Sequence, residues 1–185
     1  MAKIISGIFK GLSLNVFPNE NMRPTSCRAK EALFDIIQFD IENKSFVDLF
    51  SGTGQIGIEA LSRGASKVIF VEKSRSSFRI LKKNIDNISS HSKEKLDIEI
   101  YIDDFSNFLD NFREKVDFLF VDAPFCMHIT EKIFEKFTKI MKEDGTIIIE
   151  SSSKNKQIEK CQNFHLNKQY KYGSIMLGFY RYFQN

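Results

Sequence analysis

Three glycines at fixed spacing limit what this chain can fold into more than any other feature of its sequence. Gly52, Gly54 and Gly57 form a G-x-G-x-x-G motif within VDLFSGTGQIGIEA. The motif follows a strand-like stretch at 45–50 and opens a helix-like stretch at about 55–63. A strand, a glycine turn and a helix in this order place backbone N–H groups and the positive helix end at the carboxyl edge of a parallel sheet. Open α/β folds bind their ligands at that edge.

From residue 45 onward, strand-like and helix-like segments alternate. This rhythm predicts β-α-β units and a doubly wound, mostly parallel sheet with helices on both faces. The ending differs, because two strand-like stretches flank Gly173 and predict an antiparallel C-terminal hairpin. The expected strands lie at 45–50, 67–72, 97–102, 116–122 and 145–151, and the expected helices at about 55–63, 75–88, 105–112, 129–141 and 153–161.

The first 25 residues differ from the rest of the chain. Short apolar runs broken by glycines predict a small N-terminal β-hairpin extension over 1–25. Ser26 is a plausible N-cap for an amphipathic helix over 27–39, where the α/β core of residues 26–185 begins. The chain has 185 residues, so we expect a single domain over 1–185.

Cysteine usage and hydropathy exclude several classes of protein. Cys27, Cys126 and Cys161 are widely spaced, odd in number and without C-x-x-C pairing, which argues against a disulfide framework and a zinc site. The three histidines also lack ligand spacing, so we expect no metal. No apolar run approaches the eighteen or so residues that a membrane span needs. We therefore expect a cytoplasmic protein that does not contact membranes.

The charge of the chain is unevenly distributed. Residues 1–30 carry five Lys and Arg against one Glu, and residues 151–185 carry six against one. Residues 31–150 carry sixteen basic and twenty-two acidic residues, so basic ends flank an acidic centre. If the two ends fold onto one face, that face would attract a phosphate backbone, as in nucleic-acid-binding proteins. Solvated lysines on exposed edges are the simpler alternative.

Two acidic residues indicate what the glycine loop binds. Glu72 ends the next expected strand, where a carboxylate can accept hydrogen bonds from ribose hydroxyls. A carboxylate is expected at this position both in a site for NAD and in a site for S-adenosylmethionine. Asp48 separates them, because a carboxylate at the end of the first strand would repel a pyrophosphate and attract an amino group and a sulfonium. The sequence favours the methyl donor, with a nicotinamide-dependent oxidoreductase as the alternative.

Further cofactor contacts are expected beside the loop and after the third core strand. Asp104 can accept a hydrogen bond from the exocyclic amine of adenine, and it can equally be the N-cap of the following helix. Phe50 lies beside the glycine loop and Lys73 directly follows Glu72, and we include both among the expected cofactor contacts.

A second group of residues follows the fourth core strand. Asp122, Ala123, Pro124 and Phe125 form the sequence DAPF at the carboxyl end of that strand, facing the same cleft. A carboxylate and a backbone carbonyl can each accept a hydrogen bond from one exocyclic –NH₂ group, while an aromatic ring stacks on the base. Such acceptors would align the nitrogen lone pair for an in-line displacement. A turn that merely ends the strand is the simpler alternative.

At these residues the chain resembles class I methyltransferases of exocyclic amines, whose fourth strand ends in (Asp/Asn)-Pro-Pro-(Phe/Tyr). It is more narrowly similar to the bacterial family that methylates guanine N2 in 16S ribosomal RNA. The similarity covers nearly the whole chain. Ala123 stands where the family has Pro, so the chain lacks the rigid φ of proline at this position. The segments that carry it are IISGIFKGLSL, RPTSCRAKEALFDII, DLFSGTGQIGIEALSRGA, VDAPF and IIIES.

The resemblance implies a Rossmann-like methyltransferase fold with seven strands and S-adenosylmethionine as cofactor. Its implied substrate is guanine 966 of 16S rRNA, in free RNA or in the assembling small ribosomal subunit. We expect a monomer in which the N-terminal segment contributes to RNA binding. Other targets remain open, including N6 of adenine, as does an RNA-binding module whose methyl site has decayed at Ala123. The residues expected to contact RNA are Lys3, Lys10, Arg23 and Arg28.

Overall fold

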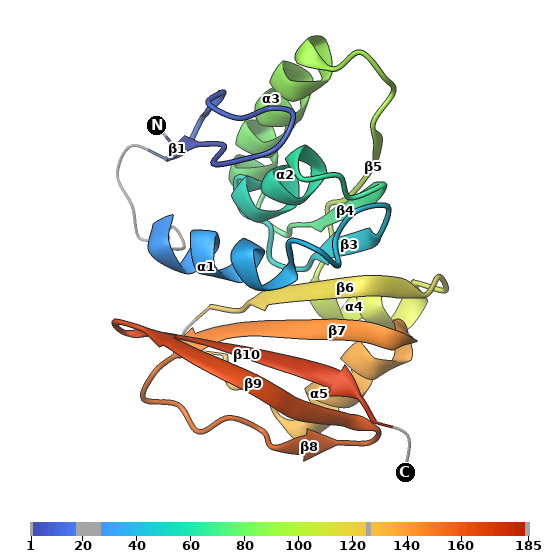
Figure 1. The fold of residues 1–185 in the computed structure, drawn as a ribbon. Helices are drawn as coiled ribbons and strands as arrows, with labels where there is room; N and C mark the ends of the chain where they lie inside the picture. The colour runs from blue at the N-terminus through green and yellow to red at the C-terminus, as the bar shows by residue number, and fades with distance from the viewer. Residues whose placement is uncertain (1, 18–26, 125–126, 184–185) are drawn as a thin grey trace.

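The computed structural model describes residues 2–17, 27–124 and 127–183, in which strands and helices alternate for most of the chain (Figure 1). The strands are β1 (Ala2–Lys3), β2 (Ser13–Leu14), β3 (Ser45–Asp48), β4 (Lys67–Val71), β5 (Asp97–Tyr101), β6 (Val116–Asp122), β7 (Met141–Ser152), β8 (Lys160–Cys161), β9 (Phe164–Tyr172) and β10 (Ile175–Tyr182). The helices are α1 (Cys27–Ile37), α2 (Gln55–Ser62), α3 (Arg75–His91), α4 (Phe105–Asn111) and α5 (Glu131–Lys139).

The large sheet has the strand order β5-β4-β3-β6-β7-β10-β9-β8. Strands β3 to β7 pair in parallel, and β10 runs antiparallel between β7 and β9. The chain leaves β3 toward β4 on one side and later returns to β6 on the other, so the carboxyl ends of β3 and β6 meet at the switch point of the topology. The expected doubly wound sheet with an antiparallel C-terminal hairpin is confirmed. The two-residue β8 adds an edge strand to the seven expected.

Helices cover both faces of the sheet (Figure 1). Helices α1, α2 and α3 and the N-terminal β1–β2 hairpin share one hydrophobic cluster with the sheet, and α4 and α5 share a second cluster on the opposite face. The central strands supply both clusters because their side chains alternate between faces. Phe46, Phe70 and Phe120 belong to the first cluster, whereas Val47 and Val121 belong to the second. This double burial explains why these strands are almost continuously apolar.

The N-terminal hairpin is small and depends on α2. Strands β1 and β2 pair antiparallel over two residues each. The Glu59 carboxylate accepts hydrogen bonds from the backbone N–H groups of Ile5 and Ser6, at 2.8 and 2.9 Å. The Ser62 hydroxyl accepts one from the N–H of Phe9, at 3.0 Å. The hairpin is therefore attached to the helix that the glycine loop opens.

One expected element is wrong. The sequence predicted a helix over 153–161, but β7 extends to Ser152 and the chain then crosses to the edge strand β8 without forming a helix. Cys161 pairs with Phe164 in the β8–β9 ladder and is buried among the residues of the second cluster. Cys161 is therefore buried by the neighbouring strand β9 and by α5 rather than by a helix formed by its own segment.

The other elements lie close to their expected positions. The helix expected over 129–141 ends at Lys139, and β7 begins at Met141 rather than near residue 145. Ser26, the expected N-cap of α1, lies outside the described residues. Among the helices that the structure describes, none combines the length and apolar character that a membrane-crossing segment requires.

Candidate active site

The glycine loop joins β3 to α2, and its glycines have two different physical roles. Gly54 is the N-cap of α2 and has a φ of 84°, in the left-handed region that side chains disfavour. Gly57 lies in the first turns of α2, where an added Cβ would come within 2.3 Å of Cε1 of Phe70 on β4. Gly54 therefore shapes the turn, whereas Gly57 lets the helix pack closely on the sheet. Gly52, with a φ of 54°, precedes them in the loop.

Asp48 lies behind this loop at the end of β3. Its side chain is buried, and its Oδ2 accepts a hydrogen bond from the backbone N–H of Gly57 at 2.9 Å. Burial raises the pKa of Asp48 to about 7; the Gly57 hydrogen bond opposes the rise, and the nearby Asp122 and Glu72 carboxylates add to it. The carboxylate therefore lies next to the loop but is not exposed at its mouth. Its contact with a ligand remains a prediction.

Glu72 connects the glycine loop to the loop that follows β4. Its Oε2 accepts a hydrogen bond from the N–H of Gly52 at 2.7 Å, and its Oε1 accepts one from the N–H of Ser74 at 2.6 Å. The two backbone segments are therefore held together by one carboxylate. Each carboxylate oxygen can accept more than one hydrogen bond, so the predicted ribose contact is compatible with both of these bonds.

Asp104 begins α4. Its Oδ1 accepts a hydrogen bond from the N–H of Ser106 at 3.0 Å, so the expected N-cap is present. Its Oδ2 lies 3.1 Å from Nζ of Lys73, which joins the ends of β4 and β5 by an exposed ion pair. The Ser106 hydrogen bond, followed by Lys73, lowers the pKa of Asp104. The rings of Phe50, beside the glycine loop, and Phe105, the first residue of α4, pack at 5.2 Å between centroids although they lie far apart in the sequence.

A cavity opens at the carboxyl ends of β6 and β7. It is lined by Asp122, Ala123 and Pro124 of the DAPF sequence, so three of the four expected catalytic residues share one cavity. The fourth, Phe125, lies outside the described residues. Burial raises the pKa of Asp122, as it does that of Asp48. Asp122 is thus placed to accept a proton near neutral pH.

The turn after Asp122 engages one of its own carbonyl groups. The backbone N–H of Met127 donates to the carbonyl of Pro124 at 2.7 Å. The carbonyl of Ala123 is therefore the better candidate for the backbone acceptor expected from the sequence. Pro124 restricts Ala123 to extended conformations even though Ala123 lacks the ring of a proline.

Several residues of this cavity were not expected from the sequence. Among the described residues no helix follows β7, and Glu150, near the carboxyl end of that strand, is one of the residues that line the cavity. Gln157 and Tyr180 line it too, and the Tyr180 hydroxyl lies 3.4 Å from Oε1 of Gln157. The one signal that could have found Glu150 is its place at the end of a parallel strand, beside the strand that ends in Asp122.

Acidic side chains dominate the site. Asp48, Glu72 and Asp122 lie close enough for the latter two to raise the pKa of the first. A positively charged ligand group would relieve this mutual repulsion, whereas a diphosphate would increase it. The donor set therefore fits a ligand with amino and sulfonium groups better than a dinucleotide. Within the described part of the chain, no cluster of histidine, cysteine or acidic residues could hold a metal ion.

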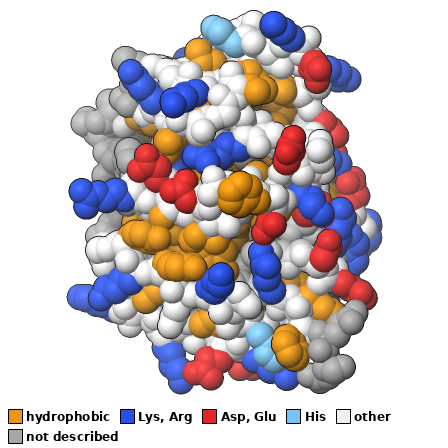
Figure 2. Space-filling view, in the orientation of Figure 1, with side chains coloured by type: hydrophobic (Ala, Val, Ile, Leu, Met, Phe, Trp, Pro, Cys, Tyr) orange, Lys and Arg blue, Asp and Glu red, His pale blue; other side chains and the backbone are white. Residues whose placement is uncertain are grey.

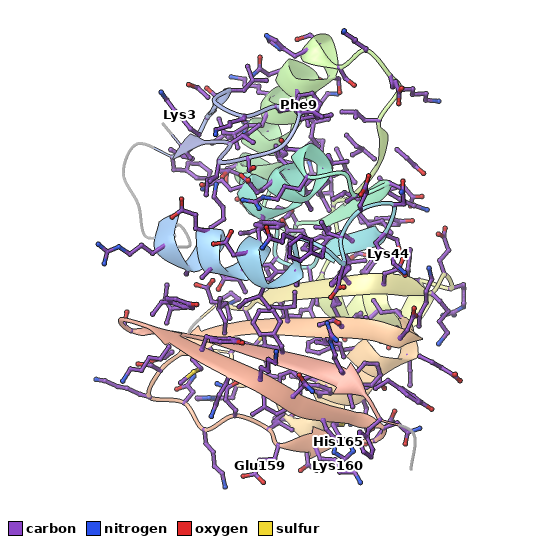
Figure 3. The ribbon with its side chains drawn as sticks, viewed as in Figure 1. Lys3, Phe9, Lys44, Glu159, Lys160 and His165 are labelled. Atoms are coloured by element: carbon purple, nitrogen blue, oxygen red, sulfur yellow. The ribbon has the colours of Figure 1, made fainter. Side chains whose placement is uncertain are left out.

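The residues expected to contact RNA are not all together. Lys3 and Lys10 are exposed on the N-terminal hairpin and Arg28 is exposed on α1, while Arg23 lies outside the described residues. Lys3 of the N-terminal hairpin and Lys160 of β8, one from each basic end of the chain, lie at opposite ends of the molecule (Figure 3). Figure 2 shows basic and acidic side chains interspersed over one view.

Comparisons with known proteins agree with this geometry. A family model described as Conserved hypothetical protein 95 matches residues 2–181. Ribosomal RNA small subunit methyltransferase D of Haemophilus influenzae is 32% identical, covering 99% of this chain and 93% of that protein. The solved structure of yhhF from Escherichia coli has a TM-score of 0.85 at 24% identity, covering 100% of this chain and 99% of that chain. The solved structure of SMU.776 complexed with SAH has a TM-score of 0.72 at 15% identity, covering 92% of this chain and 53% of that chain.

Proposed function

Because the chain belongs to the family described as Conserved hypothetical protein 95, we propose that it methylates the exocyclic N2 amine of a guanine in 16S ribosomal RNA. It is an S-adenosylmethionine-dependent methyltransferase of ribosomal RNA with a Rossmann-like fold. The finer assignment is guanine 966, and the cytoplasm, where ribosomal subunits assemble, is the proposed location. In this proposal residues 26–185 form the catalytic core and residues 1–25 an extension that contacts RNA, and the enzyme acts as a monomer.

One observation supports the proposal above the others. The end of β3 and the end of β6 bring Asp48 and Asp122 together, so that the buried carboxylate of Asp48 lies at the glycine loop and the half-buried Asp122 lies at the cavity. When bound, S-adenosylmethionine supplies an electrophilic methyl group on a positively charged sulfur. Asp48 would attract that charge from behind the loop, and Glu72 would hold the ribose. Phe50, Lys73 and Asp104 are the proposed contacts near the adenine end.

Asp122 and the Ala123 carbonyl would hold the acceptor. The amine of guanine is a poor nucleophile because its lone pair is delocalised into the ring. Two hydrogen-bond acceptors that bind its two protons would aim the lone pair at the methyl group and stabilise the positive charge that develops on nitrogen. After transfer, the carboxylate of Asp122 is the nearest group that can accept the proton, and its raised pKa suits that role.

The proposal is tested by incubating the purified protein with labelled S-adenosylmethionine and small-subunit particles from cells that lack it. Naked 16S RNA is the parallel substrate. We expect label in 16S RNA, found as N2-methylguanosine when the RNA is digested and analysed by mass spectrometry. Label at N6 of adenine would overturn the choice of base. RNA binding without any label would support the alternative that the methyl-transfer site has decayed, which the substitution of the family's Pro by Ala123 suggests.

The cofactor is tested separately. Calorimetric titrations with S-adenosylhomocysteine and with NAD measure binding to the free protein. We expect binding of the first and none of the second, because the carboxylates around the loop would repel a pyrophosphate. Binding of NAD in preference to S-adenosylhomocysteine would contradict the proposed cofactor.

A further inference from the structure

Helix α3 carries a concentration of positive charge that the methyl-transfer chemistry does not use. Its first part, residues 75–83, holds four basic residues and no acidic one, although residues 31–150 as a whole hold sixteen basic and twenty-two acidic residues. The four are Arg75, Arg79, Lys82 and Lys83. The acidic middle of the chain therefore contains one strongly basic segment.

The basic side chains lie on the solvent side of the helix. The residues of α3 that are buried against the rest of the protein are Ser77, Leu81, Asn84, Ile85 and Ile88. Arg75, Arg79 and Lys83 are exposed and follow one another at a spacing of four residues, which aligns them along one side of the helix. We call these three residues the α3 stripe.

The α3 stripe has no acidic partner in the described part of the chain. Lys82, next to it, pairs with Asp86 at 3.7 Å. The side chains of Arg75, Arg79 and Lys83 make no ion pair and no hydrogen bond with residues 2–17, 27–124 or 127–183. Their charges are therefore available to a negatively charged partner.

The stability of α3 does not account for the stripe. Like charges four residues apart repel each other, and this applies to Arg75 with Arg79 and to Arg79 with Lys83. The positive end of the helix dipole favours acidic side chains in the first turn, but the first turn of α3 holds Arg75 and no acidic residue. The stripe is unfavourable in the free protein, and a bound polyanion would relieve the repulsion.

The C-terminal half of α3 contacts the N-terminal hairpin. Oδ1 of Asn84 accepts a hydrogen bond from the backbone N–H of Asn15, directly after β2, at 2.7 Å. Nδ2 of Asn87 donates to the carbonyl of Ser13 at 3.4 Å. The hairpin therefore lies against α3 (Figure 1).

The N-terminal end of α3 lies at the carboxyl edge of the sheet. Its N-cap, Ser74, donates its backbone N–H to the carboxylate of Glu72, which also holds the N–H of Gly52. From Arg75 to Lys83 the helix rises by about 12 Å. A nucleic-acid strand presents several phosphates over such a length. The stripe thus joins the carboxyl edge of the sheet to the hairpin.

We propose that the α3 stripe binds the phosphate backbone of the RNA and continues the basic surface of the N-terminal hairpin toward the carboxyl edge of the sheet. Contacts of Arg and Lys with phosphates position a nucleic acid without reading its sequence, so the stripe contributes affinity and leaves the choice of base to the site. This inference rests on the proposed function, because it concerns how the same enzyme holds its RNA.

The test compares two variants that each remove two positive charges. Arg79→Gln with Lys83→Gln changes the α3 stripe, and Lys160→Gln with Lys168→Gln is the matched control on β8 and β9. Filter binding to transcribed 16S RNA is measured at several salt concentrations. We expect the α3 variant to bind about tenfold or more weakly, with a slope of log K against log salt concentration that is shallower by about two units. The control should bind nearly as the unmodified protein does, and equal losses in both variants would overturn the inference.

Unfolding separates RNA binding from a structural role. Because the charges of the stripe repel one another, the α3 variant should be at least as stable in urea as the unmodified protein while it binds RNA more weakly. Its affinity for S-adenosylhomocysteine should be unchanged. A variant that lost stability, cofactor binding and RNA binding together would show that the stripe supports the fold, and the inference would be wrong.

The proposed function can fail separately. If the unmodified protein methylates guanine and the α3 variant binds RNA as tightly as it does, only the role of the stripe is wrong. If the unmodified protein binds RNA through the stripe but transfers no methyl group, the proposed function is wrong and the stripe remains an RNA-binding surface. If it binds no ribosomal RNA, both are wrong.

Discussion

Asp48 and Asp122 end two neighbouring parallel strands, and each is a carboxylate that burial keeps from ionising readily. Asp48 is the register partner of Phe120, two residues before Asp122. The charge on Asp122 contributes to raising the pKa of Asp48. Two ionised carboxylates this close repel each other in the free protein, and a bound cation would relieve that repulsion. The stability of the protein and its affinity for ligands should therefore depend on pH.

The stability of the free protein should fall as pH rises from about 4 to about 7. The pKa of Asp48 is about 7 in the folded protein and near 3.8 when unfolded, so in this range the folded state holds a proton that the unfolded state has released. Its stabilisation is complete below pH 4 and is lost as pH rises through 7, by at most about 4 kcal/mol. Thermal unfolding across this range should show a smaller fall for Asp48→Asn than for the unmodified protein.

Asp122→Ala should lower turnover by about 100-fold and leave the affinity for S-adenosylhomocysteine nearly unchanged, because the carboxylate faces the acceptor side of the site. Single-turnover methylation and calorimetry separate the two effects. Asp48→Ala should do the opposite, weakening cofactor binding first. An Asp122→Ala enzyme with undiminished turnover would contradict the assigned role.

Gly57→Ala should destabilise the protein by about 1–3 kcal/mol, because the added methyl would overlap the buried ring of Phe70. Urea unfolding measures the loss. The second substitution Phe70→Leu removes the overlapping ring atoms, so adding Gly57→Ala to it should cost less than adding Gly57→Ala to the unmodified protein. An equal cost in both backgrounds would show that close packing is not the reason for this glycine.

Glu59→Gln should loosen the N-terminal hairpin. The buried Glu59 carboxylate accepts from the N–H groups of Ile5 and Ser6 and pairs with Nε of Arg63 at 2.9 Å. An amide has a single acceptor oxygen, so we expect a loss of about 1–3 kcal/mol and faster hydrogen exchange at Ile5 and Ser6. The matched control is Glu31→Gln at an exposed position of α1. In this variant hydrogen exchange at Ile5 and Ser6 should be unchanged.

Replacing Lys3 and Lys10 with Ser should weaken binding to 16S RNA. The slope of the logarithm of the binding constant against the logarithm of the salt concentration should become shallower by about one unit per lysine. The measurement is a filter-binding titration at several salt concentrations. The same change at Lys160 and Lys168 on the opposite edge of the sheet is the control. If that control lost as much affinity, RNA binding would not be specific to the hairpin face.

The α/β core was predictable because its signals are local. The apolar strands β3, β4 and β6 are buried on both faces, and the glycines mark the turn between β3 and α2. Spacing along the chain alone determines which residues can form such elements. The residues flanking the site, including Asp48, Glu72 and Asp122, were identified for the same reason, since each lies at or within two residues of the end of an expected strand.

Residues 153–161 and Glu150 were not predictable in this way. The alternation of strands and helices led us to expect a helix in the first, but the segment instead crosses to the sheet edge, where Cys161 pairs with Phe164. The place of Glu150 depends on the register between β6 and β7, which pairs it with Asp122 across 28 residues of sequence.

The sequence by itself therefore determined the order and kind of most elements and the residues at the ends of the core strands, because hydrophobic periodicity and turn chemistry act over a few residues. Only the tertiary structure decided that Asp48 is buried behind the loop and that Glu150 shares a cavity with Asp122. Strand register and burial are set by contacts between segments far apart in the chain, and no local pattern encodes them.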